Sequence, residues 1–217
     1  MSRLFNLVIC ASIFIPAVAA GHNLIEPPWA SAGGTTFQDW TFDDADNPAS
    51  PETVRNEYGE AAALITVGNM GVGWLDSQPG FGSQTGFWDL GSGGTVVLDI
   101  DNRPLALPYK EIWVQVTYFA DISAAPMVDV PMATLIDSQT VVVEDLGMGG
   151  WLLDQSSWRI EPNPLSEQII VTADPMWGSI VDQVVVHTIC VPEPATTGLL
   201  AFGGLLLLRK ERRNHHV

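Results

Sequence analysis

The stretch that decides the fold runs from residue 110 to 121 and reads Lys-Glu-Ile-Trp-Val-Gln-Val-Thr-Tyr-Phe-Ala-Asp. Apolar side chains occupy alternate positions along it. One face of an extended chain would carry Ile112, Val114, Val116, Tyr118 and Ala120. A period of two residues is that of a β-strand with one buried face. The stretch therefore predicts a long strand.

Other stretches repeat this pattern on both sides of it. Residues 95–101 and 168–174 alternate in the same way, whereas 179–191 is apolar on both faces. A strand that is apolar on both faces is typical of the centre of a sheet that is covered on both sides. Weaker strand candidates are 35–42, 61–68, 72–76, 85–90, 133–144 and 157–161.

Glycine, proline and asparagine separate the predicted strands, as at 91–94 and 147–150. A short helix is expected at 51–63, and 43–57 is expected to hold the longest loop. Eight to ten short antiparallel strands predict an all-β fold, an antiparallel β-sandwich of jelly-roll type. An immunoglobulin-like sandwich is the alternative, although its cysteine and tryptophan signature is missing.

The charge of the chain excludes one class of partner. Its 217 residues carry 25 Asp and Glu against nine Lys and Arg, a net charge of -16. Residues 21–190 are more acidic still, because they hold 23 acids and four bases, a net charge of -19. Those bases are Arg55, Arg103, Lys110 and Arg159. Such a surface cannot neutralise a run of phosphates, so no nucleic-acid partner is expected.

Two groups of side chains are candidates for ligand binding. Asp43, Asp44 and Asp46 place hard oxygen ligands in one loop, which suits Ca²⁺, although a solvated loop with an Asx turn ahead of Pro48 is favoured. The aromatic candidates for stacking on a glycan are Trp113, Phe119 and Trp151. Tryptophan is also ordinary core and edge-covering material in a sandwich, and this interpretation is favoured for each tryptophan taken singly. Only a cluster on one exposed sheet face would favour glycan stacking.

Residues 1–20 have the form of a secretory signal peptide. Arg3 supplies the positive start, residues 4–16 form the apolar region, and 17–20 are Ala-Val-Ala-Ala. Cleavage after either Ala19 or Ala20 fits the small-residue requirement. We therefore expect export, with residues 21–190 as the folded ectodomain.

Residues 191–217 begin Val-Pro-Glu-Pro-Ala, continue as an apolar segment and end in a basic tail. This arrangement resembles the PEP-CTERM sorting signal, and the resemblance is confined to these residues. The motif positions are Pro192, Glu193 and Pro194. The resemblance implies recognition by an exosortase, a membrane enzyme that removes the tail, and delivery to the cell surface or extracellular matrix. Proteins with this signal are associated with exopolysaccharide production.

The physics of the tail agrees with a transient stay in the inner membrane. Residues 195–208 are fourteen uncharged positions, which span about 21 Å as a helix against a hydrocarbon core of about 30 Å. We expect a short transmembrane helix, with an uncleaved anchor as the alternative. The basic residues that would stop transfer are Arg209, Lys210, Arg212 and Arg213.

The sequence shows few features of a catalytic site. His187 and Cys190 lie in the last apolar stretch, where structural roles are expected, and the sequence has no G-x-S-x-G or H-E-x-x-H motif. Cys190 is the only cysteine after the signal peptide, so no intramolecular disulfide is expected. We predict an exported surface or matrix protein with a structural or adhesive sandwich and no enzymatic activity. The alternatives are a glycan-binding module, with extracellular polysaccharide as partner, and a glycoside hydrolase with paired carboxylates.

Overall fold

The computed structural model describes residues 24–104 and 107–191. The signal peptide with Ala19 and Ala20, the sorting motif from Pro192 to Pro194 and the basic tail lie outside the described residues. Within them the chain forms strands and turns, and none of it is a helix that could cross a membrane.

The strands are named in chain order. Their bounds are β1 (Thr35–Trp40), β2 (Thr53–Arg55), β3 (Ala61–Thr66), β4 (Gly73–Leu75), β5 (Phe87–Asp89), β6 (Thr95–Asp101), β7 (Tyr109–Ala120), β8 (Met127–Asp129), β9 (Ala133–Asp145), β10 (Gly150–Ile160), β11 (Ser166–Thr172) and β12 (Ile180–Val191).

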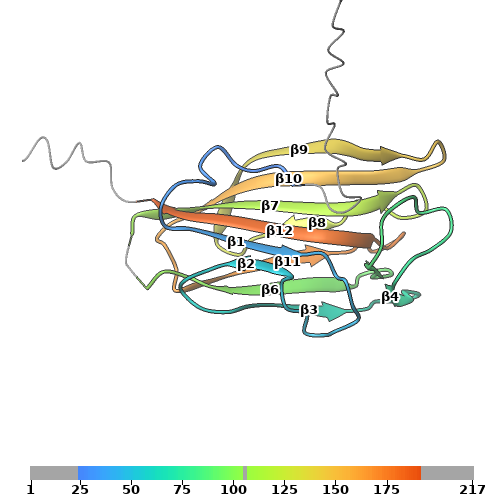
Figure 1. The fold of residues 1–217 in the computed structure, drawn as a ribbon, viewed down its shortest axis with the longest axis horizontal. Helices are drawn as coiled ribbons and strands as arrows, with labels where there is room; N and C mark the ends of the chain where they lie inside the picture. Colours follow the sequence, from blue (N-terminus) through green and yellow to red (C-terminus); the bar gives the residue numbers. More distant parts are fainter. Residues whose placement is uncertain (1–23, 105–106, 192–217) are drawn as a thin grey trace, which may run out of the picture.

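These strands form two antiparallel sheets (Figure 1). The larger sheet has the order β2-β1-β12-β7-β10-β9, with β4 and β5 attached beside β12. The smaller sheet has the order β3-β6-β11-β8. We call the face of the larger sheet that looks toward the smaller one its inward face, and the opposite face its outward face. The predicted all-β antiparallel sandwich is confirmed.

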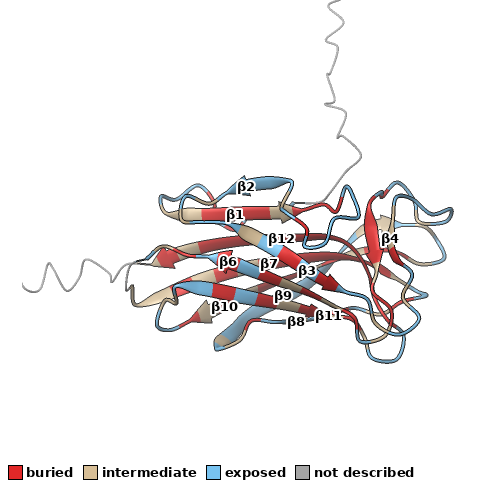
Figure 2. Ribbon diagram, turned by 90° about the horizontal axis from the view of Figure 1, so that it is seen from below, coloured by how far each residue is buried: buried red, intermediate tan, exposed pale blue. Residues whose placement is uncertain are grey.

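The core lies between the two sheets, as the buried segments of Figure 2 show. Val96 and Leu98 of the smaller sheet belong to the same buried cluster as Ile112 and Val114 of the larger sheet, and all four are fully buried. Burying each large apolar side chain contributes roughly 1.5–3 kcal/mol. Alternation along β6 and β7 therefore determines which of their faces meets the core, as the sequence predicts.

The last strand is central in the larger sheet. β12 lies between β1 and β7, and nearly every residue from Ile180 to Cys190 is buried. Its inward side chains pack into the core, and its outward side chains lie under other parts of the chain. The prediction that 179–191 is covered on both sides is confirmed.

The expected short helix at 51–63 is wrong. This segment holds β2, which pairs with β1, and the beginning of β3. All three residues of β2 are exposed. A three-residue strand has too few positions for its periodicity to be recognised, and β2 joins the sheet only by pairing with β1 across the intervening loop.

β10 begins seven residues before the predicted strand at 157–161. A tight turn after β9 places Gly150 directly back in the sheet, with Leu146 N–H donating to the carbonyl of Gly149 at 3.1 Å. Gly149 has a φ of 83°, and a Cβ there would lie 2.6 Å from the carbonyl oxygen of Ala120. The turn therefore needs glycine, and it makes β9 and β10 a long hairpin at the edge of the larger sheet.

Candidate functional site

The aromatic residues proposed for glycan stacking do not form an exposed surface. Trp151 is fully buried, and Phe119 is 3% exposed on the neighbouring strand β7. Their rings meet edge to face at 5.2 Å under Phe81 and Phe87, and Trp151 Nε1 donates to the carbonyl of Phe81 at 2.7 Å. The stacking prediction is wrong for these two residues, because the segment that contains Phe81 covers this part of the outward face.

Trp113 lies on the same outward face under the N-terminal segment. Its Nε1 donates to the carbonyl of Ile25 at 3.2 Å. The side chain of Gln115 fixes the same residue twice: its Nε2 donates to the Ile25 carbonyl at 2.7 Å, and its Oε1 accepts from the Ile25 N–H at 2.9 Å. Trp113 is half-buried and does not share an accessible face with Phe119 and Trp151, which corrects the third member of the proposed site.

His187 and Cys190 are buried in β12, as the sequence predicts. The imidazole of His187 contacts the rings of Phe37 and Trp29, and burial lowers its pKa to about 4, with the positive charge of Arg55 as a second cause. Cys190 is a free thiol whose Sγ donates to Asn102 Oδ1 at 3.3 Å, and burial raises its pKa. Both side chains are packed away from solvent.

The acidic loop is held by its own hydrogen bonds. The N–H of Asp46 donates to Asp44 Oδ1 at 2.9 Å, which is an Asx turn, and Thr41 Oγ1 donates to Asp43 Oδ1 at 2.9 Å. Within residues 24–104 and 107–191, no three His, Cys, Asp or Glu side chains are gathered closely enough to hold a metal ion. Asp44 thus forms the Asx turn that the sequence favours, and calcium binding at Asp43, Asp44 and Asp46 stays a prediction.

The two sheets differ in width, and this difference leaves part of the inward face uncovered. The smaller sheet ends at β8, a three-residue strand that pairs with the last residues of β11. In Figure 1, β9 and β10 lie at the margin of the larger sheet, beyond the strands of the smaller one. The inward side chains in the middle of β9 and β10 therefore face a groove rather than a second sheet.

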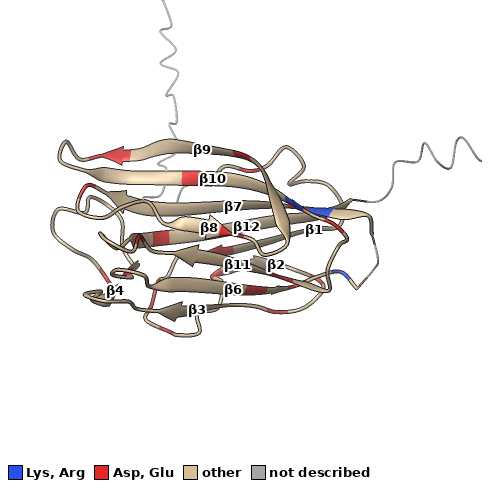
Figure 3. Ribbon diagram, turned by 180° about the vertical axis from the view of Figure 1, so that it is seen from behind, with Lys and Arg blue, Asp and Glu red and all other residues tan. Residues whose placement is uncertain are grey.

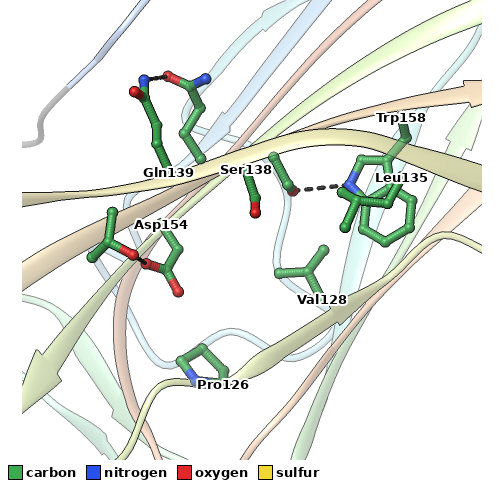
Figure 4. Close-up of a pocket in the computed structure, with 10 residues that line it drawn as sticks. Pro126, Val128, Leu135, Ser138, Gln139, Asp154 and Trp158 are labelled. Carbon is green, nitrogen blue, oxygen red and sulfur yellow. Dashed lines mark hydrogen bonds between the residues drawn. The ribbon is translucent and has the colours of Figure 1, made fainter.

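The groove has a volume of about 350 Å³ and is bounded by β8, β9 and β10 (Figure 4). Pro126, Val128 and Leu135 supply apolar surface to it. The inward polar side chains are Ser138 and Thr140 from β9 and Asp154 and Ser156 from β10. One groove thus joins an apolar wall to hydroxyl groups and a carboxylate.

Asp154 is the charged group of the groove and is held by two hydroxyl groups. Thr140 Oγ1 donates to its Oδ1 at 2.6 Å, and Tyr118 Oη donates to the same oxygen at 3.4 Å. Burial raises the pKa of Tyr118 to about 12, and the charge and hydrogen bond of Asp154 act in the same direction. Both hydrogen bonds fall on Oδ1, so Oδ2 is available to a hydroxyl group of a ligand.

Trp158 closes the groove beside Ser156. It is 9% exposed, because most of its ring belongs to the core between the sheets. Its Nε1 donates to Ser156 Oγ at 2.8 Å, which orients that hydroxyl group. Leu135, which is opposite Trp158 in the β9–β10 register, is 48% exposed and extends the apolar surface.

The other face of the same hairpin differs in its chemistry. Gln139 and Gln155 are paired across the strands, and Gln139 Nε2 donates to Gln155 Oε1 at 2.8 Å. Figure 4 shows Gln139 on the side of the ribbon away from Asp154 and Val128. Alternation thus places this glutamine pair on the outward face of the hairpin, where Gln155 is buried.

Sequence reasoning missed the groove residues, although they leave a signal. Ser138, Thr140, Asp154 and Ser156 occupy inward positions, where β6 and β7 carry Val, Leu and Ile. Polar side chains at consecutive inward positions of two paired strands indicate a sheet without an opposing layer. Their pairing becomes visible only when the register of the hairpin is known.

No known family model matches the chain, and no curated protein matches it either. Among solved structures, it is similar to one described as CBM35 from Cellvibrio japonicus Abf62, at 16% sequence identity and a TM-score of 0.27. The match covers 57% of this chain and 91% of the other. A likeness at this TM-score supports no conclusion about this chain.

Proposed function

We propose that this protein is an exported, adhesive surface or matrix protein that binds a neutral polysaccharide in the groove of β8, β9 and β10. The observation that carries the proposal is the groove itself, in which hydroxyl groups and one carboxylate face an apolar wall. We also infer that the topology of the sandwich is of jelly-roll type.

A carbohydrate suits this combination of groups. A sugar ring has hydroxyl groups at its edge, which pair with Ser, Thr and Asp oxygens, and C–H faces, which rest on apolar surface. The carboxylate of Asp154 would form the strongest of these bonds, since a hydrogen bond to a charged group contributes more than one to a neutral group. Because Thr140 and Tyr118 already hold Asp154, little ordering would be needed on binding.

The charge of the protein selects among polysaccharides. Figure 3 shows acidic residues along the length of the sandwich and basic residues toward one end. No basic side chain lines the groove, and the ectodomain has a net charge of -19. A polymer of uronic acids or sulfated sugars would be repelled, so an uncharged chain is the expected ligand.

The geometry favours binding over hydrolysis. A paired-carboxylate glycosidase needs two carboxyl groups that face each other across the scissile bond. The groove contains one carboxylate, Asp154, and its hydrogen-bond partners are hydroxyl groups. We therefore propose binding, and no catalytic role, for the groove.

Export and sorting are the second half of the proposal, and they rest on the sequence of the two ends. Residues 1–20 direct secretion, and an exosortase recognises Pro192, Glu193 and Pro194. Removal of the tail would leave the sandwich at the cell surface or in the matrix. Intact-mass measurement of protein extracted from the cell surface tests this, and molecules that retain Arg209–Val217 would contradict it.

A binding experiment tests the ectodomain function. Asp154→Asn should weaken binding to a neutral polysaccharide at least tenfold in titration calorimetry, because it removes the charged acceptor. Asp137→Asn is the matched control. It removes the same negative charge from an exposed residue of β9 that does not line the groove. Equal affinities of the two variants would contradict the proposed site. Tighter binding of an acidic polysaccharide would contradict the proposed ligand class.

A further inference from the structure

The only buried cation of the described residues bridges the two sheets. Lys110 begins the inward row of β7, and Glu167 lies in β11 of the smaller sheet. Lys110 Nζ donates to Glu167 Oε1, and both side chains are 0% exposed. Cys190 of β12 is opposite Lys110 in the register, so the pair lies at the end of the sandwich where β12 finishes.

As two ions, Lys110 and Glu167 would have too few hydrogen-bond partners. Glu167 Oε2 is buried and has no hydrogen-bond partner within the described residues, and Lys110 Nζ has Glu167 as its only partner there. A buried charge with an unpaired oxygen is costly, because the Coulomb attraction must offset the desolvation of both ions. A neutral arrangement of the same atoms would remove this cost.

The environment moves both groups toward their neutral forms. Burial lowers the pKa of Lys110, and burial raises the pKa of Glu167. Their mutual attraction opposes these shifts and is the weaker cause in each case. Proton transfer within the pair would yield an amine lone pair next to a carboxylic acid, which are the two reactants of amide formation.

We propose that Lys110 and Glu167 form an intramolecular amide bond that ties the two sheets together. The ammonium group first gives one proton to the carboxylate. The Nζ lone pair then attacks Cδ of Glu167, the bond from Cδ to the hydroxyl oxygen breaks, and the oxygen leaves as water with a second proton from nitrogen. The step needs no oxidant or cofactor, and it is independent of the function of the groove.

Position and medium both favour this step. Reactants held in contact have very high effective concentrations, and a dry site disfavours the ion pair that normally makes amide formation unfavourable. The reaction also replaces two buried charges with one neutral amide. The product would be a covalent brace in an exported domain whose only cysteine after the signal peptide is Cys190.

Peptide mapping of the full chain tests the proposal. In an unlinked chain, trypsin cuts after Lys110 and Arg159 and thereby separates Lys110 from Glu167. We expect the denatured wild-type protein to resist cleavage after Lys110. The peptide that contains Lys110 should stay joined to the one that begins at Ile160, with a mass one water below their sum. Cleavage after Lys110 with unmodified masses would overturn the proposal.

Three variants sharpen the test. Lys110→Met and Glu167→Ala should yield unlinked peptides only, whereas Glu111→Gln, which alters the partly exposed partner of Arg159, should keep the link. The side-chain amide of Asn102 is a second acyl group near Lys110. Its Oδ1 accepts from Cys190, which is opposite Lys110 in the register. A link to Asn102 would release ammonia instead of water, and that mass would refute Glu167 as the acyl donor. The wild-type map alone decides the question if a variant does not fold.

Discussion

The outward and inward faces of β10 differ in what covers them. Trp151, on the outward face, is completely buried beneath Phe81. Asp154 and Ser156, on the inward face, line an open groove, because the smaller sheet ends at β8. The side that faces solvent in many sandwiches is thus covered here, and the side that is normally core is partly open.

This comparison shows that a strand's pattern of alternation does not determine which of its faces is available to a ligand. The outward face is covered by two segments that are distant in sequence, one at Ile25 and one at Phe81. The inward face is uncovered because the opposing sheet is narrower.

Trp151→Ala should destabilise the protein by about 3–5 kcal/mol, because it removes a fully buried ring and leaves a cavity among Phe81, Phe87 and Phe119. Urea denaturation measures this free energy of unfolding. Trp177→Ala is the matched control, because Trp177 is 70% exposed and its loss should change stability by less than about 0.5 kcal/mol. Similar losses in both variants would show that the outward face is not covered as described.

His187 makes the covered outward face sensitive to acid. Its pKa is lowered from 6.5 to about 4 in the folded protein, so the unfolded chain binds a proton more readily between these values. The contribution of His187 to the free energy of unfolding is therefore fully present above pH 6.5. It decreases by about 3 kcal/mol as the pH falls toward 4.

The comparison with His187→Gln isolates this contribution from that of the carboxylates. Free energies of unfolding measured at pH 7 and pH 4 should fall by about 3 kcal/mol more in the wild type than in the variant. Parallel pH profiles for the two proteins would mean that the imidazole is not desolvated under Phe37 and Trp29.

Gln115→Ala should loosen the N-terminal cover at a smaller cost of about 1–3 kcal/mol, because it removes both side-chain hydrogen bonds to Ile25. Hydrogen exchange of the Ile25 amide should become faster in this variant. Gln139→Ala serves as its control, since it removes an amide from an exposed edge strand. Unchanged exchange at Ile25 would argue against a cover held by Gln115.

Local alternation explains why much of the fold could be predicted. β6 occupies the predicted range of 95–101, β7 is shifted by one residue from the predicted 110–121, and β12 begins one residue after the predicted 179–191. In β6 and β7, apolar side chains of a buried face alternate with side chains of the other face, whereas β12 is recognised as a run that is apolar on both faces. β2 and β8 are absent from the predicted strands, because three residues give little periodicity; β4 and β5 are as short but lie within the longer predicted stretches 72–76 and 85–90.

The candidate site was less predictable, for a related reason. Trp113, Phe119 and Trp151 alternate with the inward row, which suggests exposure, but the segments at Ile25 and Phe81 cover them. Conversely, Asp154 and Ser156 interrupt the apolar pattern of β10, which made this strand look shorter than it is. Local sequence indicates the face on which a side chain lies, whereas what covers that face depends on distant segments and on the width of the opposing sheet.

The most direct test of the central claim is to map bound polysaccharide onto the two faces of β9 and β10. Backbone amide resonances of the isotope-labelled protein should be followed by NMR as a neutral oligosaccharide is added. The account predicts that the resonances of Ser138, Thr140, Asp154 and Ser156 shift, and that those of Trp151 stay unchanged. Shifts confined to the outward face, or no saturable shift with any neutral oligosaccharide, would contradict it.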